Sequence, residues 1–187
     1  MTIYDKGLIR AMKKAYRDSG YDVALTENGI LIQAPGWGAE ILADACPNSV
    51  KSLIVLHNGS MPKMNTAVKL CKGACESEIL EVALSTLENL EDAYTAMGGL
   101  PIKPTRLLLD GLRAWQTTTD LKIKLVDVED QQILAGERFD AHLISGYIFG
   151  RSWFGCMYVA TRPVLPEDKP LIDHLAQMQW ISLDGEV

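Results

Sequence analysis

The spacing of apolar residues changes several times along the chain, and each change marks an expected element. Asp5 can cap a first helix, and Gly20 is placed to end it. The apolar residues of this segment recur at helical spacing and would form one buried face: Leu8, Ile9, Met12 and Tyr16. The first element is therefore predicted to be an amphipathic helix that packs on a core.

Two segments are typical of β-hairpins. The dipeptide Asn28-Gly29 separates the apolar runs 22–26 and 30–33, and both turn residues tolerate a positive φ. The apolar stretch 141–161 fits two further strands joined by a turn at residues 150–153. Antiparallel pairing is therefore expected near both ends of the chain.

Other runs are predicted from pattern alone. Val50 to Leu56 is expected to be a buried strand, and residues 121–125 alternate as a strand with one solvent-exposed face. Ile133 to Phe139 follows an acidic turn and is predicted to be a strand as well. The segment 38–46 fits either a third strand or a short helix, and the pattern leaves both open.

The segment after Ser60 carries the longest regular pattern in the chain. Apolar or small residues recur every 3.6 residues on average: Met61, Met64, Val68, Cys71, Cys75, Ile79, Ala83, Leu87, Leu90, Tyr94 and Met97. One helix over 61–97 would be about 55 Å long, whereas a globule of this chain length is about 40 Å across. We therefore expect a two-part helix broken near Gly73. The alternative is a continuous helix covered by a second copy of the chain.

Beyond this segment the pattern changes again. Residues 98–104 hold two glycines and two prolines and form the expected linker. Thr105 can cap a helix with an apolar face: Leu108, Leu109, Leu112 and Trp115. A last helix is expected after Pro166, with an inner face of its own: Leu171, Ile172, Leu175 and Met178.

These elements predict an α+β fold in which antiparallel strands, in two hairpin-rich regions, pack against helices that include the long or two-part central helix. The simplest organisation is a single globular domain over 1–187. Because each half shows helix, hairpin, strands and helix in the same order, an internal duplication with halves 1–97 and 105–187 joined by linker 98–104 is the alternative.

Composition and charge exclude several classes of protein. Hydrophobic residues make up 48% and charged residues 22% of the 187 residues, which is the balance of a globular protein. The net charge is −6, and with no basic stripe to offset it we expect no binding of nucleic acid. The N-terminal segment is charged where a signal peptide is apolar, and Arg151 interrupts the most apolar stretch. A soluble, cytoplasmic protein without membrane attachment is expected.

Cysteine is the first candidate for chemistry. Cys71 and Cys75 form a C-x-x-x-C motif, and His57 lies a short way upstream. Thiolates and imidazole suit copper(I) or zinc, so a metal or thiol-redox site is one hypothesis. Both cysteines also belong to the 3.6-residue stripe, and free cysteine is among the most buried residue types. Core packing without a bound metal is therefore the preferred interpretation, with a Cys71, Cys75 and His57 site as the alternative.

The remaining candidates are histidines and a turn. His57 precedes Asn58-Gly59 and is the best-placed general base, yet no nucleophile stands at a recognisable spacing from it. The turn around Arg151 and Trp153 joins two residue types that are enriched in binding sites. Trp37 lies in a similar glycine-rich loop, so if the two halves correspond, Trp37 and Trp153 flank one ligand pocket with Arg151. The alternative is that Arg151 is solvated and Trp153 folds back to cover the sheet edge.

The sequence shows no phosphate-binding glycine loop, nucleophile elbow or zinc-protease motif. We therefore expect a non-catalytic module that binds a small molecule or a protein partner, with no cofactor and with homodimerisation as one arrangement. A thiol- or metal-dependent protein is the alternative.

Overall fold

A computed structural model describes residues 5–79, 85–134 and 140–180. In chain order the elements are α1 (Lys6–Arg17), β1 (Tyr21–Leu25), β2 (Gly29–Ala34), β3 (Trp37–Leu42), α2 (Asn48–Asn58), β4 (Thr66–Cys71), β5 (Ala74–Ile79), α3 (Ser85–Met97), β6 (Leu100–Leu109), β7 (Leu112–Thr117), β8 (Ile123–Asp127), the 3-10 helix η2 (Asp130–Leu134), β9 (Asp140–Ile144), β10 (Tyr147–Ser152), β11 (Gly155–Ala160) and α4 (Lys169–Leu175). The mixed α+β class with antiparallel strands is confirmed.

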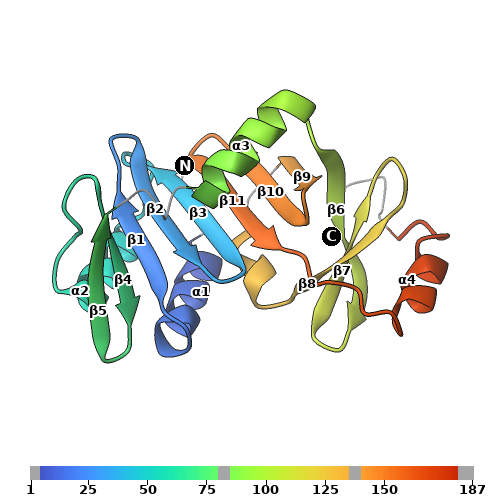
Figure 1. Cartoon of the computed structure of the whole chain (residues 1–187), viewed down its shortest axis with the longest axis horizontal. Coiled ribbons are helices and arrows are strands. Elements are labelled where there is room, and N and C mark those ends of the chain that lie inside the picture. The colour runs from blue at the N-terminus through green and yellow to red at the C-terminus, as the bar shows by residue number, and fades with distance from the viewer. Residues whose placement is uncertain (1–4, 80–84, 135–139, 181–187) are drawn as a thin grey trace.

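The strands form a single twisted sheet of 11 strands in the order β5-β4-β1-β2-β3-β11-β10-β9-β6-β7-β8 (Figure 1). All of its neighbouring strands pair antiparallel. The junction between β3 and β11 joins the strands from the N-terminal part of the chain to those from the C-terminal part, for example Ala39 opposite Met157.

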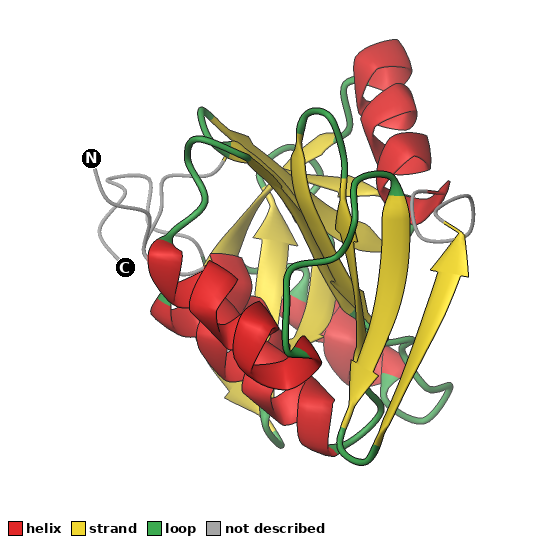
Figure 2. Ribbon diagram, turned by 90° about the vertical axis from the view of Figure 1, so that its left-hand side faces the viewer, coloured by secondary structure: helices red, strands yellow, loops and turns green. Residues whose placement is uncertain are grey.

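Helices cover both faces of the sheet (Figure 2). On one face α1 and α2 enclose the largest core cluster, in which Met12, Ile32 and Phe154 are almost fully buried. On the other face Leu87 and Leu90 of α3 pack over Leu31 and Cys156. Successive residues of a strand point to opposite faces of the sheet. Adjacent residues such as Leu31 and Ile32 therefore belong to core clusters on opposite faces.

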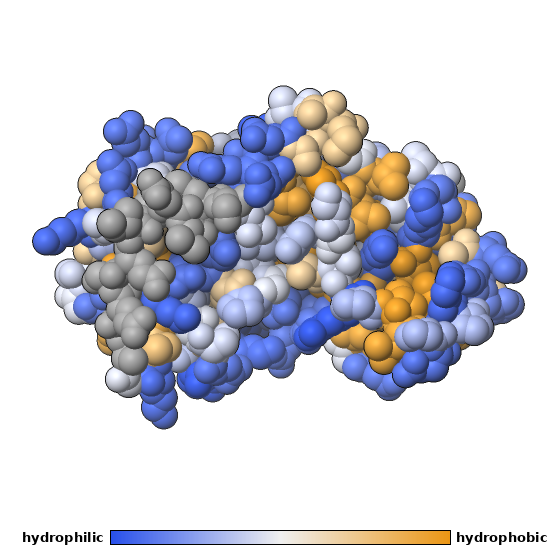
Figure 3. Space-filling view, in the orientation of Figure 1, coloured by the Kyte–Doolittle hydropathy of each residue, from blue (hydrophilic) through white to orange (hydrophobic). Residues whose placement is uncertain are grey.

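A third, smaller cluster lies where α4 packs against β7 and β8, around Ala114, Ile123 and Ile172. In Figure 3 apolar side chains gather over this end of the molecule. Several large apolar residues of this region are exposed, among them Leu108 and Leu171. No helix in the described part of the chain is long and apolar enough to cross a membrane.

Several predicted elements are confirmed. The first helix is α1, the Asn28-Gly29 hairpin is β1 and β2, and the last helix is α4. The expected cap is wrong, because Asp5 forms no capping hydrogen bond with α1. Of the expected inner face of α4, Ile172 and Leu175 are buried, whereas Leu171 and Met178 are exposed.

The stretch 141–161 holds three strands rather than the expected two, because most of β9 also lies in it. The expected hairpin is that of β10 and β11, with Arg151 within β10 and the turn formed by Trp153 and Phe154. Of the two readings of 38–46, the strand is the one observed, because residues up to Leu42 belong to β3.

The expected strand over Val50 to Leu56 is wrong: these residues lie in α2. The buried side chains of this helix are Val50, Leu53 and Ile54, at i, i+3 and i+4. Gly59 ends the helix in the left-handed region with φ 81°. A short run with several apolar residues satisfies both periods, and only packing against the core selected the helix.

The long or two-part helix over 61–97 is also wrong. Its first part is the hairpin of β4 and β5, with Gly73 in the turn at φ 93°, and among the described residues of 61–97 only those of α3 are helical. Pairing with β1 fixes β4 as a strand, with Val68 opposite Val23. The stripe at helical spacing over 66–79 was therefore coincidental. The argument for a homodimer no longer holds, because there is no over-long helix that a second copy would have to cover.

Three predictions after residue 97 need correction. The expected helix from Thr105 to Trp115 is the hairpin of β6 and β7, whose turn places Asp110 and Gly111 at positive φ. Asp-Gly between two apolar runs is a strong hairpin signal, and the prediction of a helix did not take it into account. The expected linker 98–104 shrinks to Gly98-Gly99, because β6 starts at Leu100. The predicted strand 133–139 starts within η2, and its residues 135–139 lie outside the described ranges.

The order of strands bears on the predicted duplication. Across the sheet the order β5-β4-β1-β2-β3 is followed by β10-β9-β6-β7-β8, which has the same relative order, with β11 inserted between the two groups. A helix precedes each group, and α2 and η2 occupy corresponding places in the chain. The duplication stays a prediction, to be tested by superposing the two groups of strands.

Candidate functional site

A row of basic side chains follows the outer face of α1. The inner face of this helix is buried through Leu8, Met12 and Ala15. Positions between these residues point outward and repeat at helical spacing: Lys6, Arg10, Lys13, Lys14 and Arg17. The expectation that the chain has no basic stripe is therefore wrong. All five basic residues can be read from the sequence. Because the helix was itself predicted there, their alignment on one face could have been predicted as well.

The row of basic side chains on α1 forms one wall of a groove. The acidic segment that leads into η2 forms the second wall and faces the C-terminal half of the row. Ile133 and Leu134 anchor η2 in the main core, which holds the preceding acidic segment beside α1. Gly7 lets the two elements approach closely, because a β-carbon there would lie 1.8 Å from the carbonyl oxygen of Gln132. Between the walls runs a groove of about 610 Å³, within the range of small-molecule sites.

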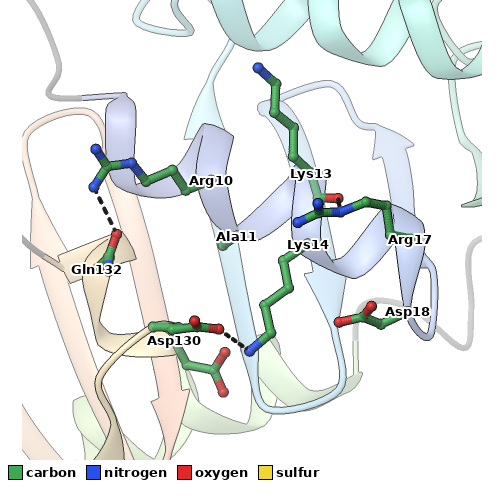
Figure 4. Close-up of a pocket in the computed structure, with 9 residues that line it drawn as sticks. Arg10, Ala11, Lys13, Lys14, Arg17, Asp18, Asp130 and Gln132 are labelled. Atoms are coloured by element: carbon green, nitrogen blue, oxygen red, sulfur yellow. Dashed lines mark hydrogen bonds and ion pairs between the residues drawn. The ribbon is translucent and has the colours of Figure 1, made fainter. Parts of the chain in front are cut away.

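Residues from both walls line the groove (Figure 4): Arg10, Ala11, Lys13, Lys14, Arg17, Asp18, Glu129, Asp130 and Gln132. Two of its cations are engaged across it. Nζ of Lys14 lies 2.5 Å from Oε2 of Glu129, and Nη1 of Arg10 donates to Oε1 of Gln132 at 3.2 Å. These contacts tie α1 to the opposite wall.

Electrostatics inside the groove follow from these contacts. The hydrogen bond to Glu129 raises the pKa of Lys14 above its ordinary value, so this side chain stays charged. Burial, together with the neighbouring charge of Asp127, raises the pKa of Asp130. The surroundings of Asp130 therefore disfavour its charged form.

Lys13 and Arg17 differ from the other two cations. Within the described ranges neither forms an ion pair with a carboxylate. Nε of Arg17 donates to the carbonyl oxygen of Lys13 at 3.2 Å, which leaves its charge uncompensated. Both side chains line the groove, and cations that have no carboxylate partner can bind an anionic group there.

His57 lies near this face but has structural partners. It is on α2, where its ring stacks on Tyr16 with centroids 3.7 Å apart, and Nδ1 lies 2.8 Å from the hydroxyl oxygen of Tyr21. Burial, and then the charge of Lys13, lowers its pKa. The neutral ring is therefore the form that the fold favours.

This lowered pKa predicts a pH-dependent stability. As the pH falls below about 6.5, the ordinary histidine value, the unfolded chain binds a proton before the folded one does, so the free energy of unfolding decreases until the folded-state pKa is passed. Urea unfolding between pH 8 and pH 5 should show a weaker decrease in His57→Gln and an intermediate one in Lys13→Gln. An unchanged slope in His57→Gln would contradict the assignment.

The two cysteines of the alternative site lie on the β4–β5 hairpin. Cys71 is half-buried and ends β4, opposite Ala74, while Cys75 lies opposite Leu70 in the backbone register. The side chain of Cys75 is outside the described part of the structure. Their expected core role rested on a helical stripe, so that reason no longer holds, and a Cys71, Cys75 and His57 site stays a prediction.

The three residues of the predicted ligand pocket are not brought together. Trp37 is 2% exposed and packs in the main core, opposite Val159. Trp153 is 53% exposed in the β10–β11 turn, at the other end of β11. Arg151 lies on β10 close to that turn and pairs with Glu91 of α3. A binding role for Arg151 and Trp153 stays a prediction, but Trp37 does not share a pocket with them.

Comparisons with known proteins add little. No protein-family model and no curated protein sequence matches the chain. Two solved structures are similar in part. One, from Eubacterium rectale and assigned as a DNA polymerase III beta subunit, is 12% identical, with 88% of this chain and 65% of that chain covered and a TM-score of 0.36. The other, a DNA polymerase III subunit beta sliding clamp from Bartonella birtlesii, is 9% identical with the same coverage and a TM-score of 0.32.

The present chain thus spans slightly less than two thirds of the length of these structures. Likeness at this level is no evidence of shared function.

Proposed function

We propose that this protein is a non-catalytic binding module and that the groove along α1 holds a small anionic ligand. The observation that carries this proposal is the pair Lys13 and Arg17, two cations that line this groove and form no ion pair with any carboxylate of the described ranges. A phosphate or carboxylate group seated between them would gain charge-assisted hydrogen bonds from both side chains.

The chemistry of the lining supports binding rather than catalysis. The described residues around the groove include no cysteine, serine, threonine or histidine, and Lys14, which could act as a nucleophile, is held in its charged form by Glu129. What the groove offers is ion pairing from α1 and hydrogen-bond acceptors from Asp18 and Asp130. A ligand with an anionic group and a nearby hydrogen-bond donor satisfies both.

Charge distribution favours a small ligand over a nucleic acid. A nucleic-acid backbone needs several uncompensated cations in line, whereas Lys14 and Arg10 are already engaged and Glu129 and Asp130 stand opposite. The net charge of −6 adds repulsion at long range. A compact anion that enters between Lys13 and Arg17 avoids most of this repulsion.

The test is calorimetric titration with inorganic pyrophosphate, and with citrate as a carboxylate counterpart, at low ionic strength. The double variant Lys13→Gln/Arg17→Gln should bind at least about tenfold more weakly, because a hydrogen bond to a charged group contributes about 1.5–3 kcal/mol. The control Lys103→Gln/Arg106→Gln removes the same charge from two exposed residues of β6 and should bind like the wild type.

Three outcomes would contradict the proposal. The first is that neither anion binds the wild-type protein, and the second is an equal loss in both double variants, which would indicate an effect of net charge alone. The third is tight binding of a 20-base-pair DNA duplex that disappears in Lys13→Gln/Arg17→Gln, which would make the row of cations a nucleic-acid contact.

A further inference from the structure

A second polar cluster lies on the opposite face of the sheet, beneath α3. Cys156 of β11 stands directly opposite Glu40 of β3 on one side and Arg151 of β10 on the other. Directly opposed residues in antiparallel strands project from the same face. The row continues through Leu31 and Ala24 on β2 and β1, which are apolar. Three polar side chains thus interrupt a row that is otherwise part of a hydrophobic core.

Glu91 of α3 completes the cluster from above. Leu87 and Leu90 of this helix are buried against the sheet, and Glu91 follows them on the same side. The carboxylate oxygens of Glu40 and Glu91 and Sγ of Cys156 all lie within 4.8 Å of one another. Nη2 of Arg151 lies 3.7 Å from Oε1 of Glu91, at the exposed edge of the cluster.

A buried thiol thus lies beside two carboxylates that come from two different elements. Cys156 is 2% exposed, and burial, followed by the charge of Glu91, raises the pKa of its thiol. The same two causes, in the same order, raise the pKa of Glu40. The geometry therefore places one thiol and two carboxylates within reach of a single ion, with Arg151 at the solvent side of the cluster.

We propose that Glu40, Glu91 and Cys156 bind a divalent transition-metal ion, with zinc as the best match. Zinc accepts thiolate and carboxylate ligands together, whereas magnesium and calcium prefer oxygen ligands alone. Three protein ligands leave one position of a tetrahedral site for water. Arg151 is exposed and can turn toward solvent as the ion enters, since its contact with Glu91 is a weak surface pair.

The geometry requires only small side-chain movements. Ligand atoms around tetrahedral zinc lie about 3.3–3.8 Å apart, given bond lengths of about 2.0–2.3 Å. The present separations of up to 4.8 Å close to these values by rotation of the two glutamates. On binding, the thiol of Cys156 transfers its proton to solvent and its sulfur donates an electron pair to the metal, so no oxidant or reductant is needed.

Cobalt(II) titration of the metal-free full-length protein tests the site, because thiolate ligation gives a sulfur-to-cobalt charge-transfer band. The wild type should show the band, and zinc should abolish it by displacement. Cys156→Ser should lose the band, and Glu91→Gln should raise the zinc dissociation constant at least tenfold. Arg151→Gln should lower that constant, because it removes a competing positive charge without removing a ligand.

Two controls separate this site from other thiols. Cys46→Ser changes another buried cysteine, which lies in the core on the α1 face, and should keep the band. Cys71→Ser should also keep it, and loss of the band in that variant would overturn the proposal in favour of the Cys71, Cys75 and His57 site. If Cys156→Ser does not fold, Arg151→Gln and Glu91→Gln decide, since unchanged zinc affinity in both would also overturn it.

Discussion

Phe154→Ala is expected to lower the free energy of unfolding by about 3–5 kcal/mol, whereas Trp153→Ala, one residue earlier, should change it by less than about 1 kcal/mol. Phe154 is 0% exposed and belongs to the main core, while Trp153 is 53% exposed. Truncation of Phe154 leaves a cavity near the junction of β11 with β3. That loss is a large part of the roughly 5–15 kcal/mol that stabilises a typical domain.

Chemical denaturation monitored by circular dichroism measures both variants under the same conditions. Trp153→Ala is the matched control because it removes the larger side chain from the same turn. Similar losses in the two variants, or a larger loss for Trp153→Ala, would show that the turn packs differently from the structure. A small effect of Trp153→Ala would leave its side chain free for a contact outside this chain.

Gly7→Ala should destabilise the protein by about 1–3 kcal/mol and weaken pyrophosphate binding at the same time. Replacing glycine by alanine inside a helix ordinarily stabilises it by about 0.5–1 kcal/mol, so the expected sign is reversed. The cause is the close approach of α1 to η2, where the new β-carbon would lie 1.8 Å from the carbonyl oxygen of Gln132. Relief of that clash moves one wall of the groove away from the other.

The neighbouring substitution Lys6→Ala serves as the control for this experiment. Lys6 is exposed at the start of α1 and does not line the groove, so both stability and pyrophosphate affinity should stay close to wild type. Thermal unfolding and calorimetry measure the two quantities separately. A stabilised Gly7→Ala variant with unchanged affinity would mean that α1 and η2 are not in contact in solution.

The candidate groove was only partly predictable. The cations of α1 and the acidic segment 129–130 are plain in the sequence, but they are more than a hundred residues apart. Their meeting depends on Ile133 and Leu134, which anchor η2 in the same core as Leu8 and Met12. The cluster beneath α3 was less accessible still, because Glu40, Glu91 and Cys156 come from three elements and share no motif.

Local chemistry alone determined the elements with strong signals. One apolar face defines α1, and Asn28-Gly29 marks the first hairpin, although Asp5 forms no capping hydrogen bond and neither Asn28 nor Gly29 adopts a positive φ. Asp110-Gly111 carried the same kind of signal for the second hairpin of this type. Composition determined the globular class.

Tertiary structure decided the rest, for a physical reason that applies to each error. The apolar residues of Val50–Leu56 and of the segment 66–79 fit both the helical and the strand spacing. The intrinsic preferences of these segments for helix and for strand therefore nearly cancel. Pairing of β4 with β1, and packing of α2 on the core, then selected the conformation. The same long-range contacts position the two charged clusters on opposite faces of the sheet, which no local pattern in the chain encodes.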